Sequence, residues 1–209
     1  ARVRIAVAQI LGLHRDADIV CGSTVVRDLV LEVGMGPAVG MRIPAVLRYD
    51  LRSVVDDWKI ERLRAYWELP AMMLQFLGNG APAVPQALQL TRALLRNQGL
   101  RGSAGFAAGF RGARYRGKRT VRGFLDAIAA GDELRAWRSL APGAEITRGD
   151  RTPLKFSMFG AELGGVTPTK LIAAGTFVTA SLPGPVPRVL IAELVGGGTA
   201  ISRLGYFAE

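Results

Sequence analysis

Four polar residues are the sequence's candidates for acid–base chemistry: His14, Asp50, Tyr66 and Asp150. A carboxylate or an imidazole can move a proton at neutral pH, and a phenol can donate a hydrogen bond to a developing oxyanion. His14 is the chain's single histidine, which excludes a multi-histidine metal site, and its polar surroundings favour a solvated turn. We expect neither a metal nor another cofactor.

One face of a predicted strand concentrates polar groups. Alternation along a strand places Tyr66 and Glu68 on the same side as Arg62 and Arg64. We interpret this side as the exposed face of a sheet, where a carboxylate pairs with arginine. The single cysteine, Cys21, falls on another predicted strand, and nothing nearby marks it as a reactive thiolate.

A strand pair occurs twice in the sequence. Residues 46–51 and 189–194 share the pattern V-L-x-x-acid-L, and residues 60–63 and 201–204 share I-x-R-L. Internal repetition is a strong guide to architecture, and each copy predicts a hairpin at the end of a domain. The repeat also predicts that Leu63 and Leu204 are both buried.

Hydrophobic periodicity and turn residues predict the remaining elements. The expected helices of the first half cover residues 1–13, 71–77 and 86–97, with β structure over 16–31 and a turn at 34–37. Thr120 is the expected N-cap of a helix that ends at Gly131, and further helical segments are expected over 134–140 and 154–163. The expected antiparallel strands of the second half are 170–174, 176–182, 188–195 and 201–207.

Residues 118–209 resemble the nuclear transport factor 2-like superfamily, in particular its SnoaL-like and ketosteroid-isomerase-like branch. The resemblance rests on a helix, Ala130-Gly131-Asp132, a second helix, the pattern A-P-x-A at 141–144 and a strand. It implies a curved antiparallel sheet wrapped by helices into a cone with an apolar cavity.

The repeat extends this resemblance to the first half of the chain. Residues 1–77 look like the last two thirds of a second such domain, with residues 78–117 as a linker. The expected fold class is therefore α+β, with two cone-like domains, the first lacking its initial helices.

The resemblance also implies where an isomerase would carry its catalytic groups. Its tyrosine falls at Phe124, which has no hydroxyl, and its general-base aspartate falls at Arg148, two residues before Asp150. Arginine stays protonated at physiological pH, so it cannot act as that base. The second domain is thus expected to bind a ligand without isomerase chemistry, and five aromatic residues are expected to line its cavity: Phe124, Trp137, Phe156, Phe177 and Phe207.

Two functions stay open from the sequence. The first is a tandem module that binds a small hydrophobic ligand or serves as a structural or interaction domain, with its two domains paired or the chain forming a homodimer. The second is an isomerase or epoxide-hydrolase-type enzyme whose active cone is the first domain.

The net charge of +10 comes from 27 Lys and Arg against 17 Asp and Glu. Clustered cations gain affinity for phosphates through counterion release, and Arg111 to Arg122 is the densest cluster. Because most cations are arginine and Ala and Gly abound, we attribute the charge to a GC-rich bacterial genome and expect a solvated linker without a nucleic-acid partner. No apolar run approaches the roughly 20 residues of a membrane span, and the single cysteine fits a cytoplasmic protein.

Overall fold

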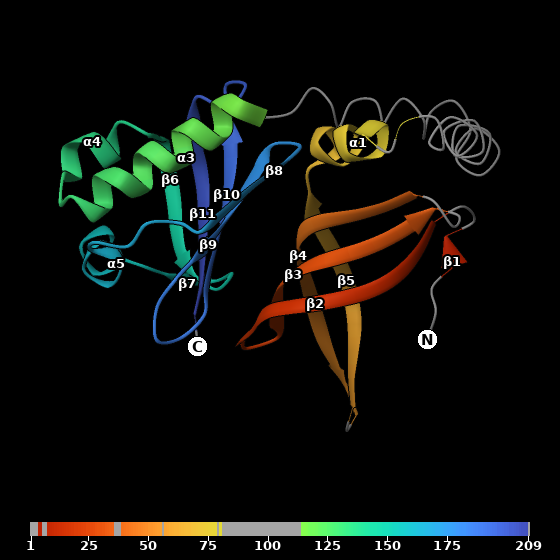
Figure 1. The fold of residues 1–209 in the computed structure, drawn as a ribbon. Coiled ribbons are helices and arrows are strands. Elements are labelled where there is room, and N and C mark those ends of the chain that lie inside the picture. Colours follow the sequence, from red (N-terminus) through yellow and green to blue (C-terminus); the bar gives the residue numbers. More distant parts are fainter. Residues whose placement is uncertain are drawn as a thin grey trace.

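The structure, a computed structural model, describes residues 4–5, 8–35, 39–55, 57–78, 80 and 114–208. Figure 1 shows two β-sheets side by side, the N-terminal one in red to orange and the C-terminal one in green to blue. The sheets are mostly antiparallel and carry four helices within the described residues, so the fold class is α+β, as predicted.

The N-terminal sheet is a meander in which each strand pairs with the next along the chain. Its strands are β1 (Arg4–Ile5), β2 (Ala8–Cys21), β3 (Thr24–Met35), β4 (Val39–Val54) and β5 (Asp57–Trp67). Helix α1 (Leu69–Gly78) then packs Met72 and Phe76 against Met41 and Ile43 of β4. The helix expected at residues 71–77 is thereby confirmed.

The helix expected over residues 1–13 is wrong, because residues 8–21 form strand β2. Ile10 and Leu13 pair with Val33 and Leu31 of β3 in a long antiparallel ladder that two register shifts interrupt. Pairing along the whole strand outweighs the local helix-like spacing of these apolar residues. Gly34 likewise lies within β3, so the expected turn cannot begin there, and residues 36–38 are outside the described part of the chain.

The repeated hairpins are confirmed, and they share their register. In the first, Asp50 pairs with Arg62 and Leu51 with Ile60; in the second, Glu193 pairs with Arg203 and Leu194 with Ile201. Each hairpin therefore has a β-bulge at the same position, between the acidic residue and the leucine. Because a bulge adds one residue to one strand and increases the local twist, the two ribbons bend alike.

The prediction that both motif leucines are buried is half wrong. Leu204 is fully buried, whereas Leu63 is 55% exposed. The difference follows from the neighbours: β11 lies between two strands and under helices, but β5 pairs only with β4 at the edge of its sheet.

The C-terminal half begins with helices α3 (Arg114–Ala129) and α4 (Glu133–Trp137). It continues with β6 (Leu140–Arg148), β7 (Thr152–Pro153), α5 (Phe156–Leu163), β8 (Lys170–Ala174), β9 (Phe177–Leu182), β10 (Arg188–Val195) and β11 (Ala200–Ala208). The sheet order is β7-β6-β11-β10-β9-β8, with only the β6–β11 pair parallel. The four strands expected after residue 170 are confirmed.

Two boundaries in this half differ from the predictions. Helix α3 starts at Arg114, six residues before Thr120, whose hydroxyl donates to the carbonyl oxygens of Arg116 and Gly198 at 3.2 and 2.7 Å instead of capping the helix. The C-terminal part of the basic cluster at residues 111–122, which was expected to be a linker, is therefore helical. Helix α4 ends at Trp137, and the helix expected over 86–97 lies outside the described residues.

Helices α3, α4 and α5 cover one face of the C-terminal sheet and enclose a closely packed core. Phe124, Phe159 and Tyr206 are at most 1% exposed; Phe124 stacks on Phe159 with ring centroids 5.9 Å apart, and Tyr206 meets Phe159 edge to face at 5.7 Å. None of the helices in the described ranges has the length and apolarity needed to cross a membrane.

An ion pair on β2 and β3 should make stability depend on pH. Hydrogen bonds from Arg27 at 2.6 and 2.8 Å, assisted by Arg15, hold the pKa of Asp18 below its ordinary value of 3.8. A lowered folded-state pKa adds stability above the unfolded-state pKa, and this stability is lost as the pH falls through the folded-state pKa.

We therefore expect Asp18→Asn to lower the free energy of unfolding at neutral pH by about 1 kcal/mol. The difference from the unsubstituted protein should vanish in acid, where Asp18 is protonated in both states. Urea unfolding over a pH series measures this, with Asp126→Asn on an exposed part of α3 as the control. A loss that persists undiminished in acid would show that the carboxylate charge is not its cause.

Candidate functional site

The uncovered face of the C-terminal sheet packs directly against the N-terminal sheet. Side chains from both sheets form one apolar cluster in which Ile19, Val26 and Val46 meet Val189 and Phe207. All five are at most 1% exposed. Two sheets that share a buried apolar core in this way hold each other in a fixed orientation.

Polar contacts around the cluster join the same two sheets. Lys170 of β8 forms ion pairs with Asp28 and, at 2.9 Å, with Asp16. The Glu68 carboxylate accepts a hydrogen bond from the Ala173 backbone N–H at 2.9 Å and pairs with Lys118 of α3. These contacts link β2, β3 and β5 to the C-terminal half.

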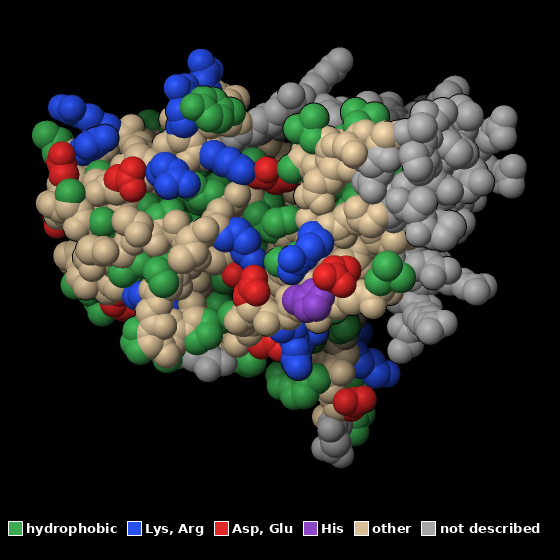
Figure 2. Space-filling model, in the orientation of Figure 1, with side chains coloured by type: hydrophobic (Ala, Val, Ile, Leu, Met, Phe, Trp, Pro, Cys, Tyr) green, Lys and Arg blue, Asp and Glu red, His purple; other side chains and the backbone are tan. Residues whose placement is uncertain are grey.

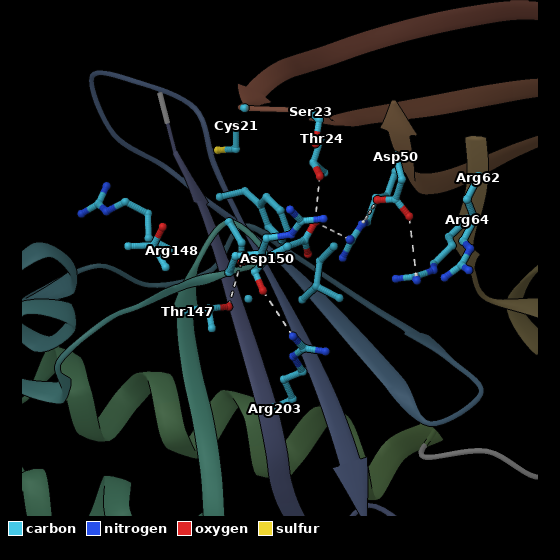
Figure 3. A pocket seen from close by; sticks show the side chains of 18 of the residues that line it. Cys21, Ser23, Thr24, Asp50, Arg62, Arg64, Thr147, Arg148, Asp150 and Arg203 are labelled. Carbon is cyan, nitrogen blue, oxygen red and sulfur yellow. Dashed lines mark hydrogen bonds and ion pairs between the residues drawn. The ribbon is translucent and has the colours of Figure 1, made fainter. Parts of the chain in front are cut away.

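A cavity of about 1070 Å³ opens where the two sheets diverge, and we call it the intersheet pocket. Strand alternation explains its N-terminal wall, because residues paired across strands share a face. Two rows of cross-strand partners form this wall or lie next to it. The first row is Cys21, Thr24, Asp50 and Arg62, and the second is Ile19, Val26, Arg48 and Arg64. The opposite wall comes from β9, β10, β11 and the turn after β6 (Figure 3).

Arg48 links the two walls of the pocket. Its guanidinium donates to Asp50 at 2.8 Å and to Asp150 at 2.5 Å, and its side chain is only 11% exposed. Thr24 also donates to Asp150, at 2.7 Å, and Figure 3 shows Asp150 pointing across from the turn after β6. The Arg48 cation also lies 5.6 Å from the Phe207 ring centroid, so it caps the shared apolar cluster.

Tyr66 is a neutral hydroxyl within this charged region. Its side chain lines the pocket at 4% exposure, and its hydroxyl makes no hydrogen bond of normal geometry to the described residues. Burial raises the pKa of Tyr66, and the nearby Arg48 and Arg64 only partly oppose that rise. The phenol therefore stays protonated at neutral pH and retains a donor for another molecule.

Three of the four acid–base candidates come together in this pocket, and one does not. Asp50, Tyr66 and Asp150 line it, although Asp150 is 100 residues from Asp50 and 84 from Tyr66 in sequence. His14 lies on β2, where its side chain is 55% exposed and sits 3.0 Å from Glu32. Figure 2 shows this single histidine on the surface, beside acidic and basic side chains.

The five aromatic candidates lie on two sides of the C-terminal sheet. Phe177 and Phe207 belong to the intersheet cluster and line the pocket. Phe124 is fully buried on the helix-covered side, where Trp137 stacks on Phe156 with ring centroids 5.0 Å apart and remains 54% exposed. They therefore do not line one common cavity.

A smaller space lies on the helix-covered side. A cleft of about 360 Å³ lies between the end of α3 and α5, lined mainly by small residues and the Phe156 ring. Arg148, at the position of the isomerase base, does not line this cleft; it pairs with Glu162 of α5 and lies 5.5 Å from the Tyr206 ring centroid.

Sequence reasoning correctly placed Tyr66, Arg62 and Arg64 on one face, but the interpretation of that face as exposed holds only for Arg62, because Tyr66 is buried and Arg64 is half-buried. This face is turned toward the second sheet, and the three residues line the intersheet pocket. Arg48 and Thr24 were missed. The pattern Arg48-x-Asp50 could have pointed to Arg48, because residues two apart on a strand share a side.

In the part of the chain that the structure describes, no three His, Cys, Asp or Glu side chains are close enough together to hold an ion. No family model and no curated protein sequence matches the chain.

Proposed function

We propose that this chain is a module that binds a small molecule between its two sheets, without chemistry of its own. The observation that carries the proposal is the intersheet pocket, whose volume of about 1070 Å³ suits an organic ligand. Four of its lining side chains are apolar, Leu51, Phe177, Ile191 and Phe207, and most of the others are charged or carry a hydroxyl group. Ligand sites combine apolar surface with polar groups in fixed positions, and this pocket carries more charge than most of them.

The proposal keeps the SnoaL-like resemblance for the C-terminal half. Support comes from α3, the Gly131 turn with a positive φ of 71°, α4 and strand β6, which follow in the order of that signature. We propose a cone-like sheet here, with the side chains of Phe124, Phe159 and Tyr206 occupying the space under the helices. We also propose that residues 1–77 descend from a second such domain. The β-bulge at the same position of both hairpins supports this.

The arrangement of Arg48 argues against acid–base catalysis. Both Asp50 and Asp150 accept hydrogen bonds from its guanidinium, which holds the two carboxylates in place. A carboxylate engaged in this way is less accessible to a proton of a substrate.

The binding proposal predicts which of two cavities takes up the neutral fluorescent probe phenylnaphthylamine. Leu51→Trp should weaken binding about tenfold, because the larger indole takes up part of the apolar surface against which the rings of the probe would pack. Ala130→Trp is the matched control, because it places the same side chain in the helix-side cleft. Fluorescence titration of the full chain measures both affinities. If the Ala130 variant alone loses affinity, the ligand site is on the other side of the sheet; if the unsubstituted chain binds no probe, a structural role is favoured.

A proton-transferring enzyme of the isomerase or epoxide-hydrolase type is the second candidate. It is favoured by one observation: two carboxylates and the neutral phenol of Tyr66 line the same pocket. An isomerisation assay of the full chain with a steroid whose double bond moves into conjugation separates the candidates. We expect no rate above that of buffer. Turnover that Asp150→Asn abolishes would establish the enzyme instead.

A further inference from the structure

The intersheet pocket has more cations than its acidic groups can neutralise. Six arginines and four acidic residues line it: Arg48, Arg62, Arg64, Arg148, Arg151 and Arg203, with Asp50, Glu61, Asp150 and Glu193. A concave site lined with excess charge of one sign attracts ligands of the opposite sign.

Only two of these arginines are strongly engaged by carboxylates. Arg48 is held between two aspartates, and Arg148 pairs with Glu162 and extends away from the other labelled side chains in Figure 3. Arg64 has only a loose contact with Asp50, at 3.8 Å.

The other arginines at the opening are at least as available. Arg203 lies 3.7 Å from the exposed Glu145 and donates one hydrogen bond, at 3.2 Å, to the backbone oxygen of Asp150. Arg62 forms no ion pair with any described residue and is exposed beside the pocket. Donor groups that a folded protein leaves unused at a pocket are available to a ligand.

The buried Tyr66 hydroxyl is an independent sign of a missing partner. Buried polar atoms normally find a hydrogen-bond partner, and this one makes no hydrogen bond of normal geometry to the described residues, although the Arg64 guanidinium lies beside it. The phenol lies on the same strand face as Arg64 and Arg62, with the apolar Phe177 ring 5.6 Å from its own ring centroid. A hydroxyl donor, two guanidinium groups and an aromatic wall thus meet at one side of the pocket.

We propose that the ligand of this pocket is an amphipathic oxyanion, a carboxylate or phosphate carried on an apolar body. Arg62, Arg64 and Arg203 bind its charged group, because a guanidinium fork matches the geometry of both oxyanions. The apolar body lies against Phe177 and Ile191, and the Tyr66 hydroxyl donates to an oxygen of the head group. This inference rests on the proposed function and adds the chemical class of the ligand.

Two probes that differ in one anionic group provide the test. Anilinonaphthalene sulfonate and phenylnaphthylamine share their aromatic rings, but only the first carries an oxyanion. We expect Arg64→Gln to weaken binding of the sulfonate about tenfold and to leave binding of the neutral probe nearly unchanged. Tyr66→Phe, which removes only the hydroxyl, should weaken sulfonate binding several-fold. Arg52→Gln is the matched control, since Arg52 is exposed on the same hairpin and does not line the pocket.

The outcomes separate the two proposals. If both probes bind and Arg64→Gln affects them equally, the ligand site stands but the oxyanion inference is wrong. If neither probe binds, or if Leu51→Trp changes neither affinity, the site itself is wrong. Displacement of the bound sulfonate by decanoate, by decyl phosphate and by the neutral decanol then identifies the head group. Displacement by decanol as effective as by the two anions would also overturn the inference.

Discussion

Replacing Phe207 with Ala should lower the free energy of unfolding by about 4 kcal/mol, as expected for removing a fully buried ring from a close-packed core. Phe207 is 0% exposed and lies in the cluster that the two sheets share. The substitution also leaves the Arg48 cation without the ring beneath it. The loss therefore affects packing within the C-terminal sheet and its contact with the N-terminal sheet.

Urea unfolding followed by circular dichroism measures this loss. Leu134→Ala, at a position 65% exposed on α4, is the control and should change stability by less than about 0.5 kcal/mol. A loss below about 1 kcal/mol for Phe207→Ala would show that the sheets do not pack as described.

Replacing Arg48 with Met is expected to cost about 3 kcal/mol, because the substitution removes a cation shared by two partly buried carboxylates. Asp50 and Asp150 would then face each other's charge without a guanidinium between them. Since Asp150 belongs to the turn after β6, the substitution also breaks a polar link between the sheets.

A double-mutant cycle isolates this link. Asp150→Asn in the Arg48→Met background should cost clearly less than Asp150→Asn alone, because its ionic partner is already absent. Arg52→Met on the same strand serves as the control and should have little effect. Strictly additive losses would mean that Arg48 and Asp150 do not interact in solution.

The sequence predicted local features of the fold well. The V-L-x-x-acid-L and I-x-R-L patterns identified both hairpins, and alternating apolar residues located the last four strands. These elements are short-range: each strand pairs with its sequence neighbour, so local patterns and turn glycines suffice.

Features that depend on distant pairing were harder to predict. Residues 1–13 carry apolar residues at helix-like spacing, yet residues 8–21 form a strand because they pair with β3. Helix α3 begins at Arg114 and includes Gly117, although glycine usually weakens a helix. In both cases tertiary contacts outweigh the local preference.

The candidate site could be predicted only in part for the same reason. Strand alternation grouped Tyr66 with Arg62 and Arg64, but no local pattern shows which surface faces them. The partner of Arg48 at Asp150 is about a hundred residues away in sequence. A pocket whose walls belong to two sheets becomes visible only when those sheets are placed together.

Amide hydrogen exchange of the full chain, with and without phenylnaphthylamine, tests most directly the claim that the ligand lies between the sheets. The account predicts slower exchange at residues 21–24, 48–51 and 147–151, which surround the intersheet pocket. Exchange at residues 128–131 and 160–165, around the helix-side cleft, should stay unchanged. Protection confined to the second group would place the ligand under the helices and contradict the account.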